Sequence, residues 1–181
     1  MRGRSAAGPP KGATRVHLRH FSKSLPMSLL RAREAVMRQF RPSLRQSGIT
    51  EQQWRVLRAL TTVTRIEVTD LARATFLLGP SLSRILQDLE SRGLVSRKAS
   101  ASDLRRGLVS ISLDGQALIE AVTPRSEAIY GEITARFGAE KLATLQGLLR
   151  ELEDALAAMA TSGRDGPASS VVPVSRETPD G

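Results

Sequence analysis

Apolar residues recur at helical spacing along most of the chain, so the sequence predicts a mostly α-helical fold. One short stretch shows the i, i+3, i+4, i+7 spacing of a single helix face, and its members are Leu82, Ile85, Leu86 and Leu89. Pro80 suits the first turn of such a helix, and Gly93 suits the left-handed residue that follows a helix end. We therefore predict a short amphipathic helix between Pro80 and Gly93.

The pattern changes to alternation immediately after this helix. Val109 and Ile111 alternate with serines, which is typical of a half-buried strand, and Leu94-Val95 begins a partner strand. Small residues at 99–102 predict the turn between the two strands. The prediction is a β-hairpin whose tip carries basic side chains.

Helical patterns also precede this hairpin. Apolar positions predict a first helix over about 25–46, with Pro42 kinking or restarting it and Gly48 ending it. Thr50 and Gln53 form a capping-box pattern in front of a second helix that runs through Leu60. A third helix is predicted over 68–74 with Thr69 as its N-cap, and the apolar connection 75–79 is expected to pack inward.

Two long helices are predicted after the hairpin. Ser112 caps the first, Pro124 bends it and Gly138 ends it. The second runs from 139 to about 159 and carries a leucine seam at alternating spacings of three and four: Leu142, Leu145, Leu149, Leu152 and Leu156. The seam favours dimerisation, and the alternative is packing of the two C-terminal helices within one chain.

The predicted fold class is mostly α with a small β-wing: a winged helix-turn-helix flanked by long N- and C-terminal dimerisation helices. Residues 1–23 are interpreted as a disordered basic arm and residues 161–181 as a disordered tail. The winged-helix domain spans 24–160. Within it, the DNA-binding lobe covers about 50–112, and the dimerisation helices cover about 24–47 and 113–160.

Charge separates the two ends of the chain. The net charge is +9, residues 1–24 hold six basic and no acidic residues, and residues 114–181 hold a net charge of −5. A basic N-terminal side predicts a polyanionic partner, and an acidic C-terminal third favours a protein partner. The arm alone would support an alternative function, that of an architectural or nucleoid protein with little sequence preference.

Several function classes are disfavoured by residue usage. The chain has no cysteine, and its two histidines, His17 and His20, both lie in the basic arm. We find no nucleophile–base pair, no ligand-spaced metal cluster and no phosphate-binding glycine loop, which argues against an enzyme, a metal site or a cofactor. The sequence also shows no apolar run of membrane-spanning length and no secretory leader, so we expect a cytoplasmic protein.

The candidate DNA-reading residues lie on the polar face of the short helix and in the hairpin. Arginine can bind guanine bidentately, glutamine can bind adenine, and an aspartate can orient an arginine for the minor groove. The candidates are Pro80, Ser81, Ser83, Arg84, Gln87, Lys98, Asp103, Arg105 and Arg106. The alternative is an ordinary surface helix with an Arg84–Asp88 pair at i, i+4.

The order of these elements resembles the MarR family of winged-helix transcriptional regulators over about residues 24–159. The resemblance is carried by the segments 68–72, 82–95, 103–106 and 109–115. It implies a homodimer that binds a palindromic double-stranded DNA operator.

The segments 28–37, 40–44, 49–55, 128–130 and 136–138 are similar to one branch of that family, the homoprotocatechuate-operon regulators (HpaR branch). This resemblance implies a repressor of aromatic-acid catabolism, such as that of hydroxyphenylacetates, which an aromatic carboxylate effector releases from DNA.

A site for such an effector is expected near the first helix, because arginine binds carboxylates and methionine and tryptophan can line a ring pocket. The candidates are Ser28, Arg31, Arg33, Met37, Trp54 and Arg55. The alternative is that these arginines face solvent or pair with Glu34 and Glu51.

Overall fold

The computed structural model describes residues 20–99 and 107–162. The chain divides into two compact units, Met1–Ile129 and Tyr130–Gly181. The described elements are η1 (Phe21–Lys23), α1 (Leu25–Gln46), α2 (Glu51–Leu60), β1 (Ile66–Glu67), α3 (Val68–Thr75), α4 (Gly79–Ser91), β2 (Val95–Ala99), β3 (Gly107–Ile111), α5 (Leu113–Phe137) and α6 (Ala139–Ser162). The predicted fold class, mostly helical with a small β-wing, is confirmed.

The first described residues differ slightly from the prediction. Phe21–Lys23 forms a 3-10 turn, so assigning these residues to a disordered arm was wrong. Helix α1 has the predicted bounds and continues past Pro42 without restarting. Gly48 has φ 68° and follows the helix end, as expected. Thr50 and Gln53 form both hydrogen bonds of the predicted capping box at the start of α2.

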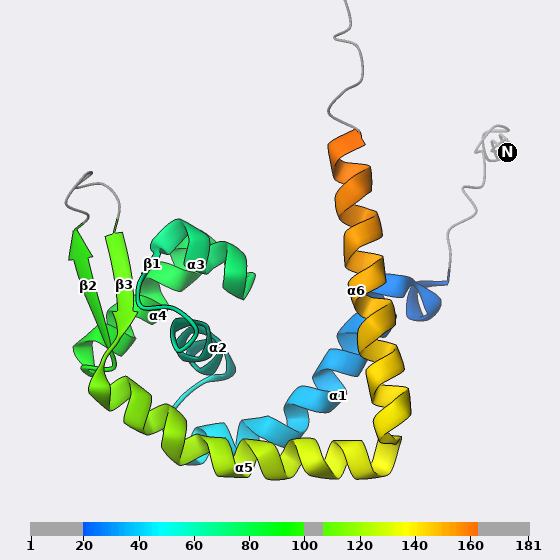
Figure 1. Cartoon of the computed structure of the whole chain (residues 1–181), viewed down its shortest axis with the longest axis horizontal. Helices are drawn as coiled ribbons and strands as arrows, with labels where there is room; N and C mark the ends of the chain where they lie inside the picture. The colour runs from blue at the N-terminus through cyan, green and yellow to red at the C-terminus, as the bar shows by residue number, and fades with distance from the viewer. Residues whose placement is uncertain (1–19, 100–106, 163–181) are drawn as a thin grey trace, which may run out of the picture. The chain divides into compact units, whose positions relative to one another are not determined.

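The helix-turn-helix consists of α3 and α4, which lie with α2 beside the β2–β3 hairpin (Figure 1). Glu67 is the N-cap of α3, so the predicted cap at Thr69 was wrong, because the helix begins one residue before Thr69. Pro80 occupies the first turn of α4, and Gly93 has φ 71° after its end, both as predicted.

The connection between α3 and α4 does not pack inward as a whole. Phe76 adopts a left-handed conformation with φ 52° and is 89% exposed, and Leu78 is 78% exposed. Leu77 between them is the residue that packs against the core. The chain reverses within these few residues, from a left-handed C-cap to an extended N-cap, so only one of the three side chains faces inward.

Leucines from the inner face of α4 form the centre of the core. Leu82, Leu86 and Leu89 are each 0% exposed. They pack in one cluster with residues of α2, α3 and the sheet, among them Val56, Leu57, Leu60, Leu71, Val95 and Val109. The predicted apolar face is therefore the buried face of α4, which leaves its opposite side on the surface.

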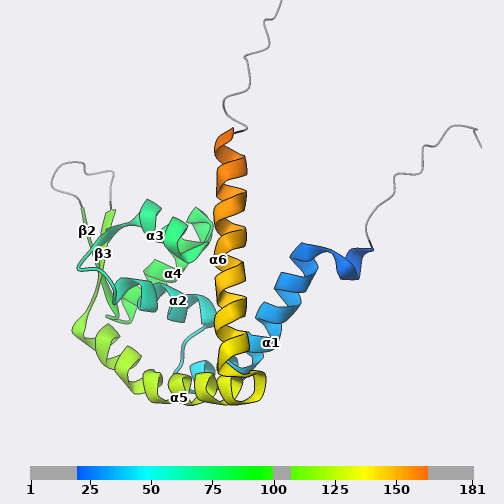
Figure 2. The same cartoon turned by 45° about the vertical axis from the view of Figure 1, so that its right-hand side comes forward.

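The sheet has three antiparallel strands in the order β1-β3-β2, and the hairpin stands beside α3 and α4 in both views (Figures 1 and 2). Val95 pairs with Ile111 and Ala99 with Gly107. Of the two predicted inward residues, Val109 is fully buried and Ile111 is half-buried against the core. Most of the predicted turn at 99–102 lies outside the described residues.

The step from sheet to α5 is tightly packed. Ser112 Oγ donates to Gly93 O at 2.6 Å and accepts from Gly115 N at 3.0 Å, as expected of the predicted cap. A Cβ atom on Gly115 would lie 2.2 Å from Leu94 O, so only glycine fits there. Helix α5 contains Pro124 and remains a single helix.

The second unit holds the end of α5 and all of α6. Gly138 has φ 98° between the two helices, where the sequence predicts a helix end. Along α6, Leu145 is 41% exposed, Leu148 57% and Leu156 52%. Among the described helices, none combines the length and the apolar character needed to cross a membrane.

Candidate nucleic-acid interface and effector site

The outer face of α4 carries the predicted reading residues together. Pro80, Ser81, Ser83, Arg84 and Gln87 are all exposed on it. Because the opposite face of the same helix is packed into the core, these side chains are presented on a rigid support.

The alternative Arg84–Asp88 pair is not formed. Asp88 instead accepts from Gln53 Nε2 at 2.6 Å and lies 3.5 Å from the Arg92 guanidinium. Within residues 20–99 and 107–162, Arg84 makes no ion pair, so its guanidinium is available to an external acceptor. Sequence reasoning missed the contact to Gln53, because it joins residues 35 positions apart.

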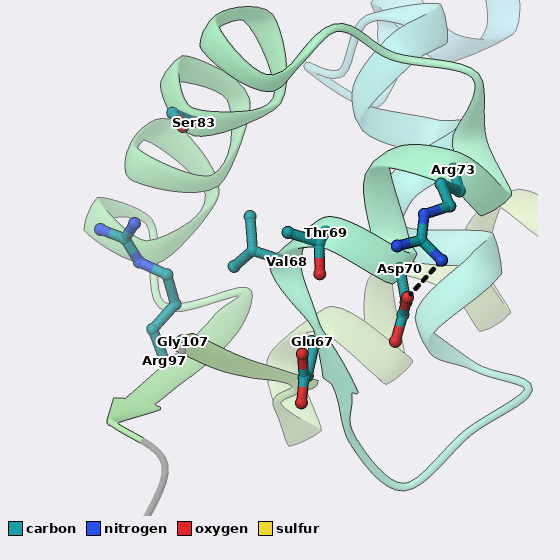
Figure 3. A pocket seen from close by; sticks show the side chains of 8 residues that line it. All are labelled: Glu67, Val68, Thr69, Asp70, Arg73, Ser83, Arg97 and Gly107. Atoms are coloured by element: carbon teal, nitrogen blue, oxygen red, sulfur yellow. Dashed lines mark ion pairs between the residues drawn. The ribbon is translucent and has the colours of Figure 1, made fainter. Parts of the chain in front are cut away.

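A cleft of about 660 Å³ lies between α3, α4 and the β2–β3 hairpin (Figure 3). Ser83 and Arg97 lie on one side of it, and Asp70 and Arg73 on the other. Glu67 also lines the cleft, so the acidic residues in its lining equal the basic ones. The described lining of the cleft therefore has no excess positive charge.

Arg97 links the hairpin to α4. Its Nε and Nη2 atoms contact Glu90 Oε2 at 2.7 Å and 2.6 Å. This ion pair holds β2 against the C-terminal half of α4. Lys98 is exposed on the same strand, whereas Asp103, Arg105 and Arg106 lie outside the described residues.

Arginines and glutamates form a cluster where α1 meets α2, which we call the Glu51 cluster: Arg33, Glu34, Arg41, Glu51 and Arg55. Arg41 contacts Glu34 at 2.8 Å and Glu51 at 3.0 Å, and Arg33 pairs with both glutamates. The hydrogen bond from Arg41 holds the pKa of Glu34 below its usual value. The cluster thus joins the first helix to the start of the second.

The predicted effector residues fall into three groups. Ser28 and Arg31 are exposed on α1, and Met37 and Trp54 are half-buried. Arg33 and Arg55 already have carboxylate partners in the Glu51 cluster. For these two arginines, the alternative of pairing with Glu34 and Glu51 therefore holds. An incoming anion would therefore have to share or displace those partners.

Arg58 is not among the predicted effector residues. Its guanidinium carbon lies 5.8 Å from the centroid of the Trp54 ring, a cation–π arrangement on the surface of α2. Among the described residues, Arg58 has no carboxylate partner. The signal was available in the sequence, because Trp54 and Arg58 stand at i and i+4 on one helix.

The fold and the exposed face of α4 are those of winged-helix transcription regulators. A family profile described as the MarR family matches residues 47–106. The HTH-type transcriptional regulator FarR of Neisseria gonorrhoeae is 41% identical over 136 residues, which cover 74% of this chain and 93% of FarR. The homoprotocatechuate degradative operon repressor of Escherichia coli is 41% identical over 128 residues, which cover 71% of this chain and 86% of that repressor.

A solved structure agrees with these relatives. NadR in complex with 4-hydroxyphenylacetate superposes with a TM-score of 0.65 and 38% identity, over 76% of this chain and 97% of NadR. The chain belongs to the MarR family. It is therefore a transcriptional regulator rather than an enzyme.

Proposed function

We propose that the protein represses an operon for aromatic-acid breakdown and that an aromatic carboxylate releases it from its operator. The main support for DNA binding is the exposed face of α4. On this face Arg84 makes no ion pair with any described residue. The catabolic part is supported by the relatives, one named for homoprotocatechuate degradation and one bound to 4-hydroxyphenylacetate. A protein with this role acts in the cytoplasm.

In the proposed complex, α4 lies in the major groove of the operator. Arg84 contacts a guanine, Gln87 an adenine, and Ser81 and Ser83 allow the helix to approach closely. Lys98, Arg105 and Arg106 of the wing contact the neighbouring minor groove or phosphates, with Asp103 orienting one arginine. The Arg97–Glu90 pair fixes the wing strand relative to the reading helix.

We further propose that the protein acts as a homodimer. Leu145, Leu148 and Leu156 of α6 are exposed, as are Leu29 and Leu30 of α1. Leucine-rich helix faces of this kind bury their surface against other helices. A second copy would cover them and place two reading helices on the two halves of a palindromic operator.

The effector is proposed to bind beside α1 and α2. Arg31, Arg33 and Arg55 would supply cations for its carboxylate, with Ser28 as a polar contact and Met37 and Trp54 against its ring. Arg58 joins this set, because it is an uncommitted cation at the face of Trp54.

The test of DNA binding is fluorescence anisotropy with the intergenic DNA upstream of the protein's own gene and a scrambled duplex of equal length. A regulator binds the first more tightly at physiological salt, typically by about 10³-fold or more. Equal affinity for both duplexes would instead support the architectural alternative, in which the basic residues 1–24 provide most of the binding.

A further inference from the structure

Glu51 stands at the centre of the charged contacts between α1 and α2. It is the first residue of α2, and its side chain is 11% exposed. Three guanidinium groups contact it, from Arg33 and Arg41 of α1 and from Arg55 of α2. One carboxylate therefore serves as the shared partner of cations on two helices.

Arg55 extends this contact to the helix-turn-helix. Its Nη2 lies 3.3 Å from Glu51 Oε1, and its Nη1 donates to Thr75 O at 2.9 Å. Thr75 is the last residue of α3, is fully buried, and donates from Oγ1 to Leu71 O at 2.6 Å. A continuous polar path therefore runs from α1 through Glu51 and Arg55 to the turn in front of the recognition helix.

A second path connects the same end of α2 to the recognition helix itself. Gln53 Oε1 accepts from Thr50 N at 2.7 Å as part of the capping box, and Gln53 Nε2 donates to Asp88 Oδ2 at 2.6 Å. Both ends of this buried amide are thus engaged. The first turn of α2 is consequently tied to both helices of the helix-turn-helix.

The charge of the cluster makes it responsive to an added carboxylate. Three arginines face two glutamates, so one positive charge is in excess. A second carboxylate that approached Arg33 or Arg55 would take up the same guanidinium donors that hold Glu51. The added carboxylate and Glu51 would thus compete for the same arginines. The acid could change the partners of Glu51 in this way without touching α3.

We propose that Glu51 is the intramolecular competitor of the effector carboxylate, and that it is the positioning residue that couples the effector surface to the reading helices. This inference rests on the proposed function. When the acid engages Arg55, the bridge from Glu51 through Arg55 to Thr75 O is lost, and the state with the intact bridge is the one that binds DNA. The acid therefore binds the protein more tightly when the bridge is open than when it is intact. This difference in affinity is what allosteric release from DNA requires.

The experiment compares the full-length protein with Glu51→Gln, Glu51→Asp and the control Glu132→Gln. Glu132 is an exposed carboxylate that faces Arg136 at 3.9 Å, remote from the cluster in sequence. Operator affinity is measured with and without 4-hydroxyphenylacetate, and the ratio of the two dissociation constants is the readout. Melting temperatures report whether each variant is folded.

The wild type and Glu132→Gln should show the same ratio, on the order of tenfold or more. Glu51→Gln should bind the operator more weakly without acid and bring the ratio within about threefold of unity, because its bridge is already open. Glu51→Asp keeps the charge and should give a ratio closer to the wild type. An unchanged ratio in folded Glu51→Gln would overturn the inference.

Two further results separate the possible failures. Loss of operator preference, or of any response to the acid, in the wild type would contradict the proposed function rather than the role of Glu51 within it. If Glu51→Gln does not fold, hydrogen exchange on the wild type replaces it. The acid should then speed exchange of the amides at 71–78, and unchanged protection there would overturn the inference.

Discussion

Helices α4 and α6 carry similar leucine patterns but have different surroundings. In α4 the leucines at 82, 86 and 89 are fully buried within the chain. In the predicted seam of α6, Leu145 is 41% and Leu156 52% exposed, and Leu142, Leu149 and Leu152 are half-buried. The same periodicity thus marks a fully buried face in α4 and a partly exposed face in α6. Spacing therefore identifies an apolar face but not the partner that covers it.

The largest expected effect is a loss of stability when a buried leucine of α4 is shortened. Leu86→Ala should destabilise the protein by about 2–5 kcal/mol, because it leaves a cavity in a fully packed core. Urea unfolding followed by circular dichroism measures this change. The matched control is Leu78→Ala, which removes an exposed leucine and should cost below about 0.5 kcal/mol. Equal losses for the two variants would show that α4 is not anchored by this face.

The exposed leucines of α6 should affect association more than folding. Leu145→Ala should raise the dissociation constant of the dimer by about tenfold or more, because a central interface leucine is lost from both copies. Sedimentation velocity over a range of concentrations measures this constant. Gln146→Ala changes an exposed neighbour outside the leucine seam and should leave the constant unchanged. A monomeric wild type would contradict the proposed role of the seam.

The outer face of α4 should affect recognition with little effect on stability. Arg84→Ala should remove about 1–3 kcal/mol of discrimination between operator and scrambled DNA, since a bidentate contact to guanine is lost. Competition anisotropy with the two duplexes measures the difference. Arg150→Ala removes the same charge from an exposed site on α6 and should preserve the discrimination. If both variants discriminate equally well, Arg84 does not read bases.

The smallest effect is expected at an isolated surface pair. Glu132→Gln removes an exposed i, i+4 contact to Arg136 at 3.9 Å and should change stability by less than about 0.5 kcal/mol. Thermal unfolding is the measurement. A loss comparable to that of Leu86→Ala would mean that α5 depends on this pair rather than on its packing.

Features with a local cause could be predicted from the sequence. The bounds of α1, the capping box at Thr50 and Gln53, and the glycines at 93 and 138 each depend on residues within one or two helical turns. The predicted cap at Thr69 was wrong although a helix cap also depends on nearby residues. Glu67 and Thr69 both lie near the helix start, and α3 begins directly after Glu67.

Contacts between distant residues could not be predicted in the same way. The Arg84–Asp88 pair satisfies the helical spacing rule, but Asp88 bonds instead to Gln53, which only the folded chain brings near. Likewise, the individual arginines of α1 were visible as charges, whereas their convergence on Glu51 depends on the packing of α1 against α2. The exposed Phe76 reflects a backbone reversal that apolarity alone does not reveal.

The central claim is that the protein binds one operator specifically and that an aromatic acid releases it. The most direct measurement is titration of 4-hydroxyphenylacetate into the complex of the wild-type protein with its own upstream DNA, followed by fluorescence anisotropy. We expect a saturable loss of specific binding with 4-hydroxyphenylacetate. Benzyl alcohol, which has a ring but no carboxylate, should produce no loss. Binding that ignores both DNA sequence and acid would contradict it.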